Sequence, residues 1–179
     1  MATHQFKTQY QKAMPALQKE LGITNVMAIP KITKVVVTTG TGRNRDKKRA
    51  VVIVDRLAKI TGQKSSPRGA KISIASFKLR EGEIIGYATT LRGEKMWSFL
   101  SKLINVAIPR MRDFRGLEVK AIDSMGNFTM GVKEHTIFPE TSDDDLKDVF
   151  GIGINVVTTA KDKKSAEALL RTVGFPFKK

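Results

Sequence analysis

The sequence predicts an α+β fold, in which helices pack on one face of a largely antiparallel sheet to make a two-layer sandwich. A β-branched run from Ile32 to Thr39 is typical of a strand. Apolar residues spaced by three and four predict helices, as in Asp46 to Thr61. A hairpin signal, Ser124-Met125-Gly126-Asn127, separates two further strand-like runs. Because strands and helices intermix through both hairpin and crossover connections, the α+β class is favoured.

The first half of the chain predicts two helices around one strand. Apolar residues from Phe6 onward are spaced by three and four, which predicts an N-terminal helix that ends at Gly22. Pro15 inside this pattern indicates a kink or a late helix start. The strand over Ile32 to Thr39 follows, and Gly62 is well placed to end the second helix.

The second half of the chain continues the same mixture. Trp97 and Phe99 fall on a predicted helix, where we expect them to pack in the core. No internal repeat or long linker divides the sequence, so we expect a single domain over residues 1–179. The predicted elements are a strand over Glu83 to Arg92, a helix over Glu94 to Asn105 ended by Pro109, two strands within Glu118 to Lys133, a strand over Ile152 to Ala160 and a helix over Ser165 to Val173.

Net charge indicates a nucleic-acid partner. The chain has 179 residues with 32 Lys and Arg against 17 Asp and Glu, a net charge of +15. A basic membrane-surface protein is the main competing class for the same charge. No segment reaches the roughly 18 apolar residues of a membrane span, and the N-terminus lacks a secretory signal. We therefore expect a soluble, cytoplasmic protein without a membrane partner.

Metal and cofactor chemistry finds no support in the residue types. The chain has no cysteine, which excludes disulfides and thiolate zinc sites. Its two histidines, His4 and His135, lie far apart in the sequence. We expect no metal site and no cofactor.

A run without acids, from Arg56 to Arg80, locates the expected anion-binding surface. An ordinary salt-bridged surface would mix acids among the cations, so an external polyanion is the natural source of counter-charge. Hydroxyl groups and Phe77 offer further contacts to sugar and base, and exposure of Phe77 is an even choice. The basic residues of the run are Arg56, Lys59, Lys64, Arg68, Lys71, Lys78 and Arg80. A basic, hydroxyl-bearing open sheet face suits the wide, shallow minor groove of RNA.

The glycine-rich turn Gly40-Thr41-Gly42 allows an enzyme alternative. Such turns before helices cradle phosphates, but the third glycine of the dinucleotide fingerprint and a following Gly-Lys-Ser/Thr are both missing. A tight turn is the better interpretation. With no plausible histidine base near a serine or threonine, we expect no catalysis. The alternatives are a basic nucleotide-dependent enzyme that uses this turn and a general double-stranded nucleic-acid binder.

Two charged segments each allow two interpretations. Arg110, Arg112 and Arg115 follow Pro109, and form either a solvated loop or a phosphate contact. The acidic cluster of Asp143, Asp144 and Asp145 is either a solvated surface loop or a contact for a basic protein, because acids on an RNA-binding face would repel RNA.

Seven collinear strings resemble one family, the bacterial form of large-subunit ribosomal protein five, the universal 5S rRNA-binding protein of the central protuberance. The resemblance runs from Tyr10 to Phe177. The strings are Thr61 to Lys64, Ser73 to Gly82, Ile85 to Gly93, Ile108 to Leu117, Gly126 to Phe128, Ile137 to Glu140 and Val157 to Ala160.

The resemblance implies an α+β sandwich that binds 5S rRNA, anchors it in the large subunit and takes part in translation. It also implies contact with the P-site tRNA through a protruding basic loop, and a bridge to a basic protein of the small-subunit head. By position, the 5S rRNA contacts fall on Thr38, Gln63, Lys64, Thr90 and Arg92. The tRNA-binding loop comprises Lys71, Ser73, Ile74, Ala75, Ser76, Phe77 and Lys78. The bridge falls near Phe138 to Asp148, which gives Asp143, Asp144 and Asp145 their partner.

Three positions depart from the family pattern. Thr38 stands where the family commonly has Asn, so an amide contact to RNA becomes a hydroxyl contact. Lys71 is followed by Ile72 instead of a second cation, which removes one expected charge from the loop. Ser65-Ser66-Pro67-Arg68 replaces a more apolar strand, which predicts a shorter or shifted strand there.

Overall fold

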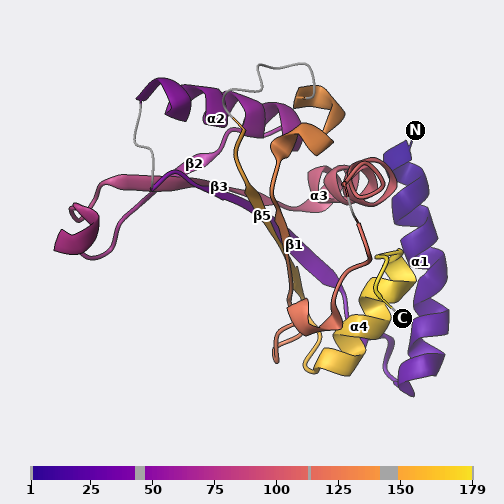
Figure 1. The fold of residues 1–179 in the computed structure, drawn as a ribbon. Helices are drawn as coiled ribbons and strands as arrows, with labels where there is room; N and C mark the ends of the chain where they lie inside the picture. Colours follow the sequence, from indigo (N-terminus) through magenta and orange to yellow (C-terminus); the bar gives the residue numbers. More distant parts are fainter. Residues whose placement is uncertain (1, 43–46, 113, 142–148, 179) are drawn as a thin grey trace. The chain divides into compact units, whose positions relative to one another are not determined.

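The computed structural model describes residues 2–42, 47–112, 114–141 and 149–178, and confirms the α+β fold (Figure 1). Within these residues one sheet has the strand order β2-β3-β1-β5-β4. Four α-helices accompany the sheet in this part of the chain. The bounds are α1 Ala2–Leu21, β1 Ile32–Gly40, α2 Lys47–Thr61, β2 Ser66–Gly69, β3 Ile84–Leu91, α3 Gly93–Lys102, β4 Phe128–Val132, β5 Ile152–Thr158 and α4 Lys163–Val173.

The chain forms two compact units, which are described separately. Unit 1 comprises Met1–Val35, Leu91–Met130 and Asn155–Lys179, and unit 2 comprises Val36–Thr90 and Gly131–Ile154. The expectation of a single domain stays a prediction.

Unit 2 is built around helix α2 and strands β2 and β3. The inner face of α2 carries Ile53, Leu57 and Ile60, all essentially inaccessible to solvent. Spacings of four and three place these three side chains on one side of the helix. As expected, α2 ends before Gly62, whose φ of 65° lies in the left-handed region that glycine adopts at little cost.

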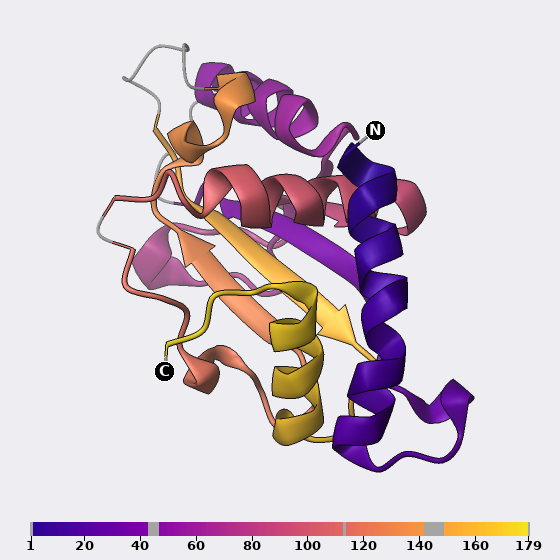
Figure 2. The ribbon, with the colours of Figure 1, turned by 90° about the vertical axis from the view of Figure 1, so that its right-hand side faces the viewer.

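Unit 1 holds helices α1, α3 and α4 (Figure 2). Trp97 is buried between α3 and α1, with ring centroids 4.7 Å from Tyr10 and 6.2 Å from Phe6. Phe99 is buried as well, so both aromatic residues of α3 occupy the core as predicted. Helix α1 continues through Pro15, which excludes a late helix start.

The predicted hairpin within residues 118–133 is only half correct. Its second strand is β4, but its first half contains a short 3₁₀ helix, Val119–Ala121, and a single antiparallel bridge between Ile122 and Phe128. The turn itself is well formed, because the backbone N–H of Asn127 donates to Asp123 Oδ1 at 2.6 Å. Turn chemistry at this position was correctly recognised, whereas the strand before it was not.

Helix α3 ends in a way that the sequence pattern did not predict. The α-helix stops at Lys102 and is followed by a π-helical turn, Leu103–Ala107. The amide of Ile108 donates to the carbonyl of Leu103 at 2.9 Å, five residues back. π-helical turns are rare and frequently mark functional positions.

Candidate nucleic-acid interface

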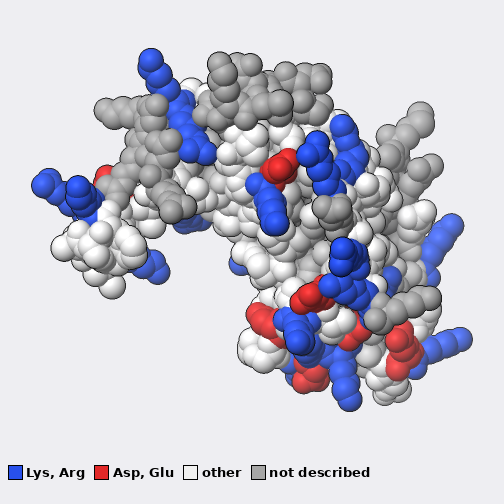
Figure 3. Space-filling view, viewed as in Figure 1, with Lys and Arg blue, Asp and Glu red and all other residues white. Residues whose placement is uncertain are grey.

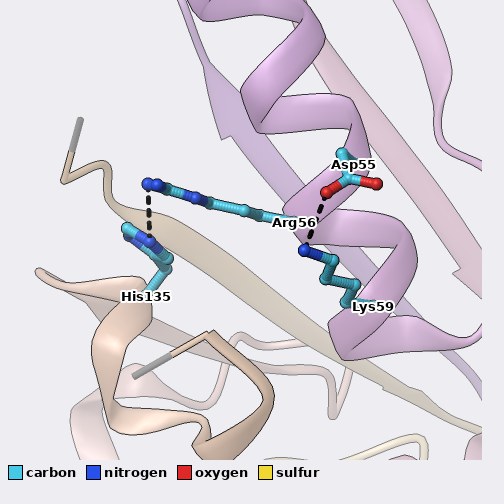
Figure 4. Close-up of polar contacts among 4 residues, drawn as sticks. All are labelled: Asp55, Arg56, Lys59 and His135. Atoms are coloured by element: carbon cyan, nitrogen blue, oxygen red, sulfur yellow. Dashed lines mark hydrogen bonds and ion pairs between the residues drawn. The ribbon is translucent and has the colours of Figure 1, made fainter. Parts of the chain in front are cut away.

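The two cations at the start of the acid-free run, Arg56 and Lys59, lie on helix α2 and contact neighbouring side chains (Figure 4). Arg56 is 5% exposed, and its Nη1 lies 3.1 Å from Nε2 of buried His135. The imidazole of His135 stacks on Phe150 with centroids 4.2 Å apart. Lys59 is exposed but forms an ion pair of 3.0 Å with Asp55, one turn earlier in α2. Both cations thus lie on helix α2 and already contact neighbouring side chains, and five other cations of the run remain.

Strand β1 presents alternate residues to two different environments in unit 2. Val37 and Thr39 are buried, whereas Thr38 between them is only half-buried and lies on the opposite face. The Thr38 hydroxyl donates to the carbonyl oxygen of Gly153 in β5 at 3.3 Å. A Cβ atom at Gly153 would lie 2.9 Å from Thr38 Oγ1. Glycine at position 153 therefore leaves the space that the Thr38 side chain occupies.

Strands β2 and β3 extend the same kind of surface. Their antiparallel pairing joins Ser66 to Ala88 and Arg68 to Gly86, so each pair shares one face. Thr90 lies two residues beyond Ala88 and is therefore on that face too. Strand β2 has four residues and an irregular register after Arg68, and the expectation that it is shorter than or shifted from the family pattern stays a prediction.

A close approach of β1 and β3 requires glycine at position 86. A Cβ atom there would lie only 2.6 Å from the backbone carbonyl oxygen of Thr39. No ordinary side chain fits at that distance, because the obstacle is main chain and cannot rotate away. The two strands thus meet without any side chain between them at this position.

The residues predicted for 5S rRNA divide between a common surface and separate positions. Gln63 is half-buried and its amide Nε2 donates to the Thr90 carbonyl oxygen at 3.3 Å, which brings these two predicted residues together. Lys64 is exposed directly after Gln63. Arg92 is also exposed but belongs to unit 1. We call the set of Thr38, Gln63, Lys64, Ser66, Arg68, Thr90 and Gly153 the sheet face of unit 2.

Ser66 and Arg68 were not among the residues predicted to contact 5S rRNA, although Arg68 belongs to the acid-free run. The signal that could have found them is the pairing of β2 with β3, which puts them level with Ala88 and Gly86. The sheet face therefore combines small and hydroxyl-bearing residues with cations at its β2 side. Bulky side chains would hold a nucleic-acid groove away from the strands, and Thr38, Ser66, Thr90 and Gly153 carry none.

The predicted tRNA-binding loop connects β2 to β3 and has defined internal structure. At its base the amide of Ala70 donates to the Glu83 carbonyl at 2.9 Å. Nearer its tip Ile74 and Leu79 exchange two backbone hydrogen bonds of 3.0 and 3.1 Å, which enclose the 3₁₀ turn Ala75–Phe77. Lys78 closes this turn with φ of 49°, and is the sole non-glycine residue with positive φ in the described chain.

The tip of this loop is apolar as well as basic. Ile72 and Phe77 are each 70% exposed, so the open question about Phe77 is decided in favour of exposure. In Figure 3 the outer end of the segment between β2 and β3 is largely uncharged, with Lys and Arg on its flanks. Ser73 is exposed too, and its Oγ accepts the backbone N–H of Glu81 at 2.9 Å. Ser76 and Ala75 are exposed in the turn itself.

The remaining predicted features are the acidic cluster, the glycine-rich turn and the expected absence of a metal site and of a membrane span. The acidic cluster Asp143, Asp144 and Asp145 lies outside the described residues. In the Gly40–Gly42 turn, the amide of Thr41 donates to the Ile85 carbonyl at 2.8 Å, which joins the turn to strand β3. Across the ranges that the structure covers, no group of three His, Cys, Asp or Glu side chains is arranged to hold a metal ion. No helix within those ranges is long and apolar enough to cross a membrane.

Comparisons with known proteins show the family to which the chain belongs. A family model described as "Ribosomal protein L5" matches residues 25–80, and a second model, for the C-terminus of the same ribosomal family, matches residues 84–177. A large ribosomal subunit protein uL5 from Desulfotalea psychrophila is 48% identical over 169 residues, covering 94% of both chains. Proteins of the same description from Parasynechococcus marenigrum and Kocuria rhizophila are 46% and 47% identical, covering 96% and 98% of this chain and 97% and 94% of their own lengths. The chain therefore belongs to the ribosomal protein L5 family.

Proposed function

We propose that this chain binds 5S rRNA through the sheet face of unit 2 and helps to anchor it in the central protuberance of the large ribosomal subunit. Family membership makes the chain a structural ribosomal protein that takes part in translation on the cytoplasmic ribosome, and not an enzyme. The alternative of a nucleotide-dependent enzyme is thereby wrong. Specific recognition of 5S rRNA goes beyond family membership, and stands on the geometry of the sheet face.

The observation that carries the proposal is that small and hydroxyl-bearing residues of the sheet face lie beside its exposed cations. Thr38 and Thr90 carry hydroxyl groups at half-buried positions, and Gly153 adds no side chain beside Thr38. Because the Thr38 hydroxyl donates to the Gly153 carbonyl, its oxygen lone pairs remain to accept a hydrogen bond from a 2′-hydroxyl. An RNA minor groove displays such hydroxyls across a wide, shallow surface.

Binding of the full-length protein to 5S rRNA in a salt series tests the proposal. We expect log affinity to fall against log salt by roughly 0.7–0.9 per neutralised phosphate. Lys64→Gln and Arg68→Gln should each lower this slope by about one such increment. Lys59→Gln is the matched control, because Lys59 is already paired with Asp55. A slope that is flat for the native chain, or equally reduced in the control, contradicts the proposed surface.

A general double-stranded nucleic-acid binder is a separate outcome of the same experiment. An RNA duplex of the same length as 5S rRNA serves as competitor. If the duplex displaces 5S rRNA at equal concentration, recognition is general and the 5S-specific function is wrong.

We further infer that the loop from Lys71 to Lys78 contacts the P-site tRNA. Its support is the exposed tip, where Phe77 offers a ring for stacking and Lys71 and Lys78 offer charge. Replacing both lysines by alanine should weaken tRNA binding to assembled ribosomes while leaving binding of the isolated protein to 5S rRNA unchanged. Equal loss of both activities would show that the loop and the sheet face are not separate sites.

The acidic cluster is proposed as the bridge to a basic protein of the small-subunit head. Its support is charge alone, because three consecutive carboxylates stand out in a chain of net charge +15. Changing Asp143, Asp144 and Asp145 to asparagine should weaken association of the two ribosomal subunits without lowering affinity for 5S rRNA. Unchanged subunit association would remove this role.

A further inference from the structure

Four exposed lysines of unit 1 come from two distant parts of the sequence and lie at one end of the sheet. Lys31 precedes strand β1, Lys161 follows β5, and Lys163 and Lys164 begin α4. We call these four residues the lysine patch. We propose that the lysine patch binds the phosphate backbone of RNA, as a contact separate from the sheet face and from the tRNA-binding loop. The inference rests on the proposed role of the chain as a ribosomal RNA-binding protein.

Backbone pairing brings the two parts of the patch together, although 128 positions separate Lys31 from Thr159 in the sequence. The amide of Lys31 donates to the hydroxyl oxygen of Thr159 at 2.9 Å, and the amide of Thr159 donates to the carbonyl oxygen of Lys31 at 2.9 Å. Lys161 follows two residues later, so its Cα atom lies within about 7 Å of that of Thr159. Figure 2 shows the start of α4 and the chain leading into β1 at the same end of unit 1.

The backbone that carries the patch is held in place before any partner binds. Ile32, which follows Lys31, is buried, and so is Ala160, which precedes Lys161. The amide of Ala160 also donates to the hydroxyl oxygen of Thr158 at 3.1 Å. Binding of a partner therefore costs the freedom of the lysine side chains and little freedom of the main chain.

The lysine patch contains little counter-charge of its own. Asp162 is the one acid between residues 159 and 166, so four lysines against one aspartate leave a net charge of +3. In the described structure the Asp162 carboxylate forms no ion pair with these lysines and does not cap α4. The next acid along the chain, Glu167, is engaged by Arg171 at 2.8 Å. An external polyanion is thus the natural source of counter-charge for the patch.

Two of these lysines stand where helix stability alone would favour acids. Lys163 and Lys164 lie in the first turn of α4, which contains no acidic residue. The aligned peptide dipoles give this end of a helix a partial positive charge, so a cation there lowers the stability of the helix. The charge of both lysines therefore works against the fold of α4, and this cost is removed once a phosphate group neutralises them.

The composition of the patch favours RNA over an acidic protein as its partner. Interfaces between proteins have an apolar centre and are depleted in lysine. Between residues 159 and 164 the exposed side chains carry only hydroxyl, ammonium and carboxylate groups. Ammonium groups on long, flexible stems bind phosphates as point charges and read no sequence. We therefore expect sequence-independent affinity that depends strongly on salt.

A quadruple variant, K31Q/K161Q/K163Q/K164Q, tests the proposal in the full-length chain. Two protein-free RNAs serve as separate probes, isolated 5S rRNA and the long rRNA of the large subunit. Four lost phosphate contacts should lower the salt slope for at least one probe by roughly 2.8–3.6, so the fall in affinity between 50 and 200 mM salt becomes roughly 50- to 150-fold smaller. The matched control is K7Q/K12Q/K19Q/K120Q, which removes equal charge from described lysines elsewhere in unit 1.

The melting temperature of the double variant K163Q/K164Q gives an independent readout. Glutamine has nearly the helix propensity of lysine, so the change removes charge and little else. Relief of the unfavourable dipole interaction should raise Tm by roughly 1–8 °C, while the salt slope for RNA falls by roughly 1.4–1.8. A lower Tm would show that the two lysines serve the fold, and would overturn the inference.

The outcomes separate this inference from the proposed function. A slope reduced in the quadruple variant and not in the control supports the lysine patch, whatever the behaviour of Lys64→Gln toward 5S rRNA. Equal reduction in both variants shows only a dependence on total charge and overturns the inference. Unchanged slopes with both RNAs overturn it as well, and poorer incorporation into large subunits would then assign the patch to an acidic protein. Circular dichroism checks that each variant is folded, and K163Q/K164Q carries the test if the quadruple variant is not.

Discussion

The contact between Thr38 and Gly153 supports a quantitative prediction about the sheet face. In Gly153→Ala the new Cβ atom would lie 2.9 Å from Thr38 Oγ1, closer than such atoms approach in real proteins. The Thr38 side chain must move, and its hydrogen bond of 3.3 Å to the Gly153 carbonyl is then lost.

Three contributions set the expected magnitude. Loss of a neutral hydrogen bond costs about 1 kcal/mol, and crowding adds about 1–3 kcal/mol. Alanine in place of glycine inside a strand returns about 0.5–1 kcal/mol. We therefore expect Gly153→Ala to lower the free energy of unfolding by about 1–3 kcal/mol. In the Thr38→Ala background the obstacle is absent, so the same substitution should raise stability by about 0.5–1 kcal/mol.

Urea denaturation of the four proteins in this cycle measures the coupling between the two positions. We expect a coupling energy of about 2–4 kcal/mol, the sum of the hydrogen-bond and crowding contributions, well beyond the roughly 0.5 kcal/mol scatter of independent sites. Thr38→Val is the control background, because a valine methyl group takes the place of the hydroxyl and keeps the obstruction. Additive effects in the alanine cycle would refute the proposed contact, as would rescue by valine equal to rescue by alanine.

Three further results are expected from the same structure. Gly86→Ala places a Cβ atom 2.6 Å from a backbone oxygen and should lower the free energy of unfolding by about 1–3 kcal/mol, or Tm by roughly 2–12 °C. Gly131→Ala is the control, because its new Cβ atom meets no atom within 4 Å. Equal melting temperatures of the two variants would contradict the close approach of β1 and β3. Burial raises the pKa of Tyr10, so the stability that its neutral form contributes should be fully present below about pH 10 and be lost as pH rises through the folded-state pKa. In a denaturation series at increasing pH, Tyr10→Phe should remove this alkaline loss of stability. If the loss persists in the variant, Tyr10 is not its source. Hydrogen bonds from Asn127 lower the pKa of exposed Asp123, which NMR titration of its carboxyl carbon should show below the ordinary value of 3.8; a normal or raised value would contradict the turn geometry.

The regular elements were predictable because their apolar residues follow one period over several turns. Helix α2 shows this clearly, since Ile53, Leu57 and Ile60 are the positions that its stripe assigns to the core. The segment before the turn at Asp123 was not predictable in the same way. Only one bridge, between Ile122 and Phe128, joins its sides, and a short apolar run does not distinguish a strand from a 3₁₀ turn.

The sequence predicted which residue types form the candidate site, but not which of them lie next to one another. Gln63 and Thr90 are 27 positions apart, and only the fold shows that an amide of one bonds the backbone of the other. Arg56 gave a misleading signal, because a cation in an acid-free run is normally exposed. Its contact with His135 lies 79 positions away and cannot be inferred from local charge. The family resemblance predicted Thr38 as a site residue. The place of Arg68 beside Gly86 could be seen only from the pairing of β2 with β3.

Lys78 has a consequence for engineering this protein. A left-handed backbone costs a lysine roughly 1–2 kcal/mol that glycine would not pay. Lys78→Gly is therefore among the first substitutions that a stability-driven redesign would select, and it would delete a cation from the proposed tRNA contact. Screening by melting temperature alone would favour this change, although it would weaken the proposed binding of tRNA to the ribosome. Thermostabilised versions of the chain should for that reason be ranked by translation rate and accuracy as well.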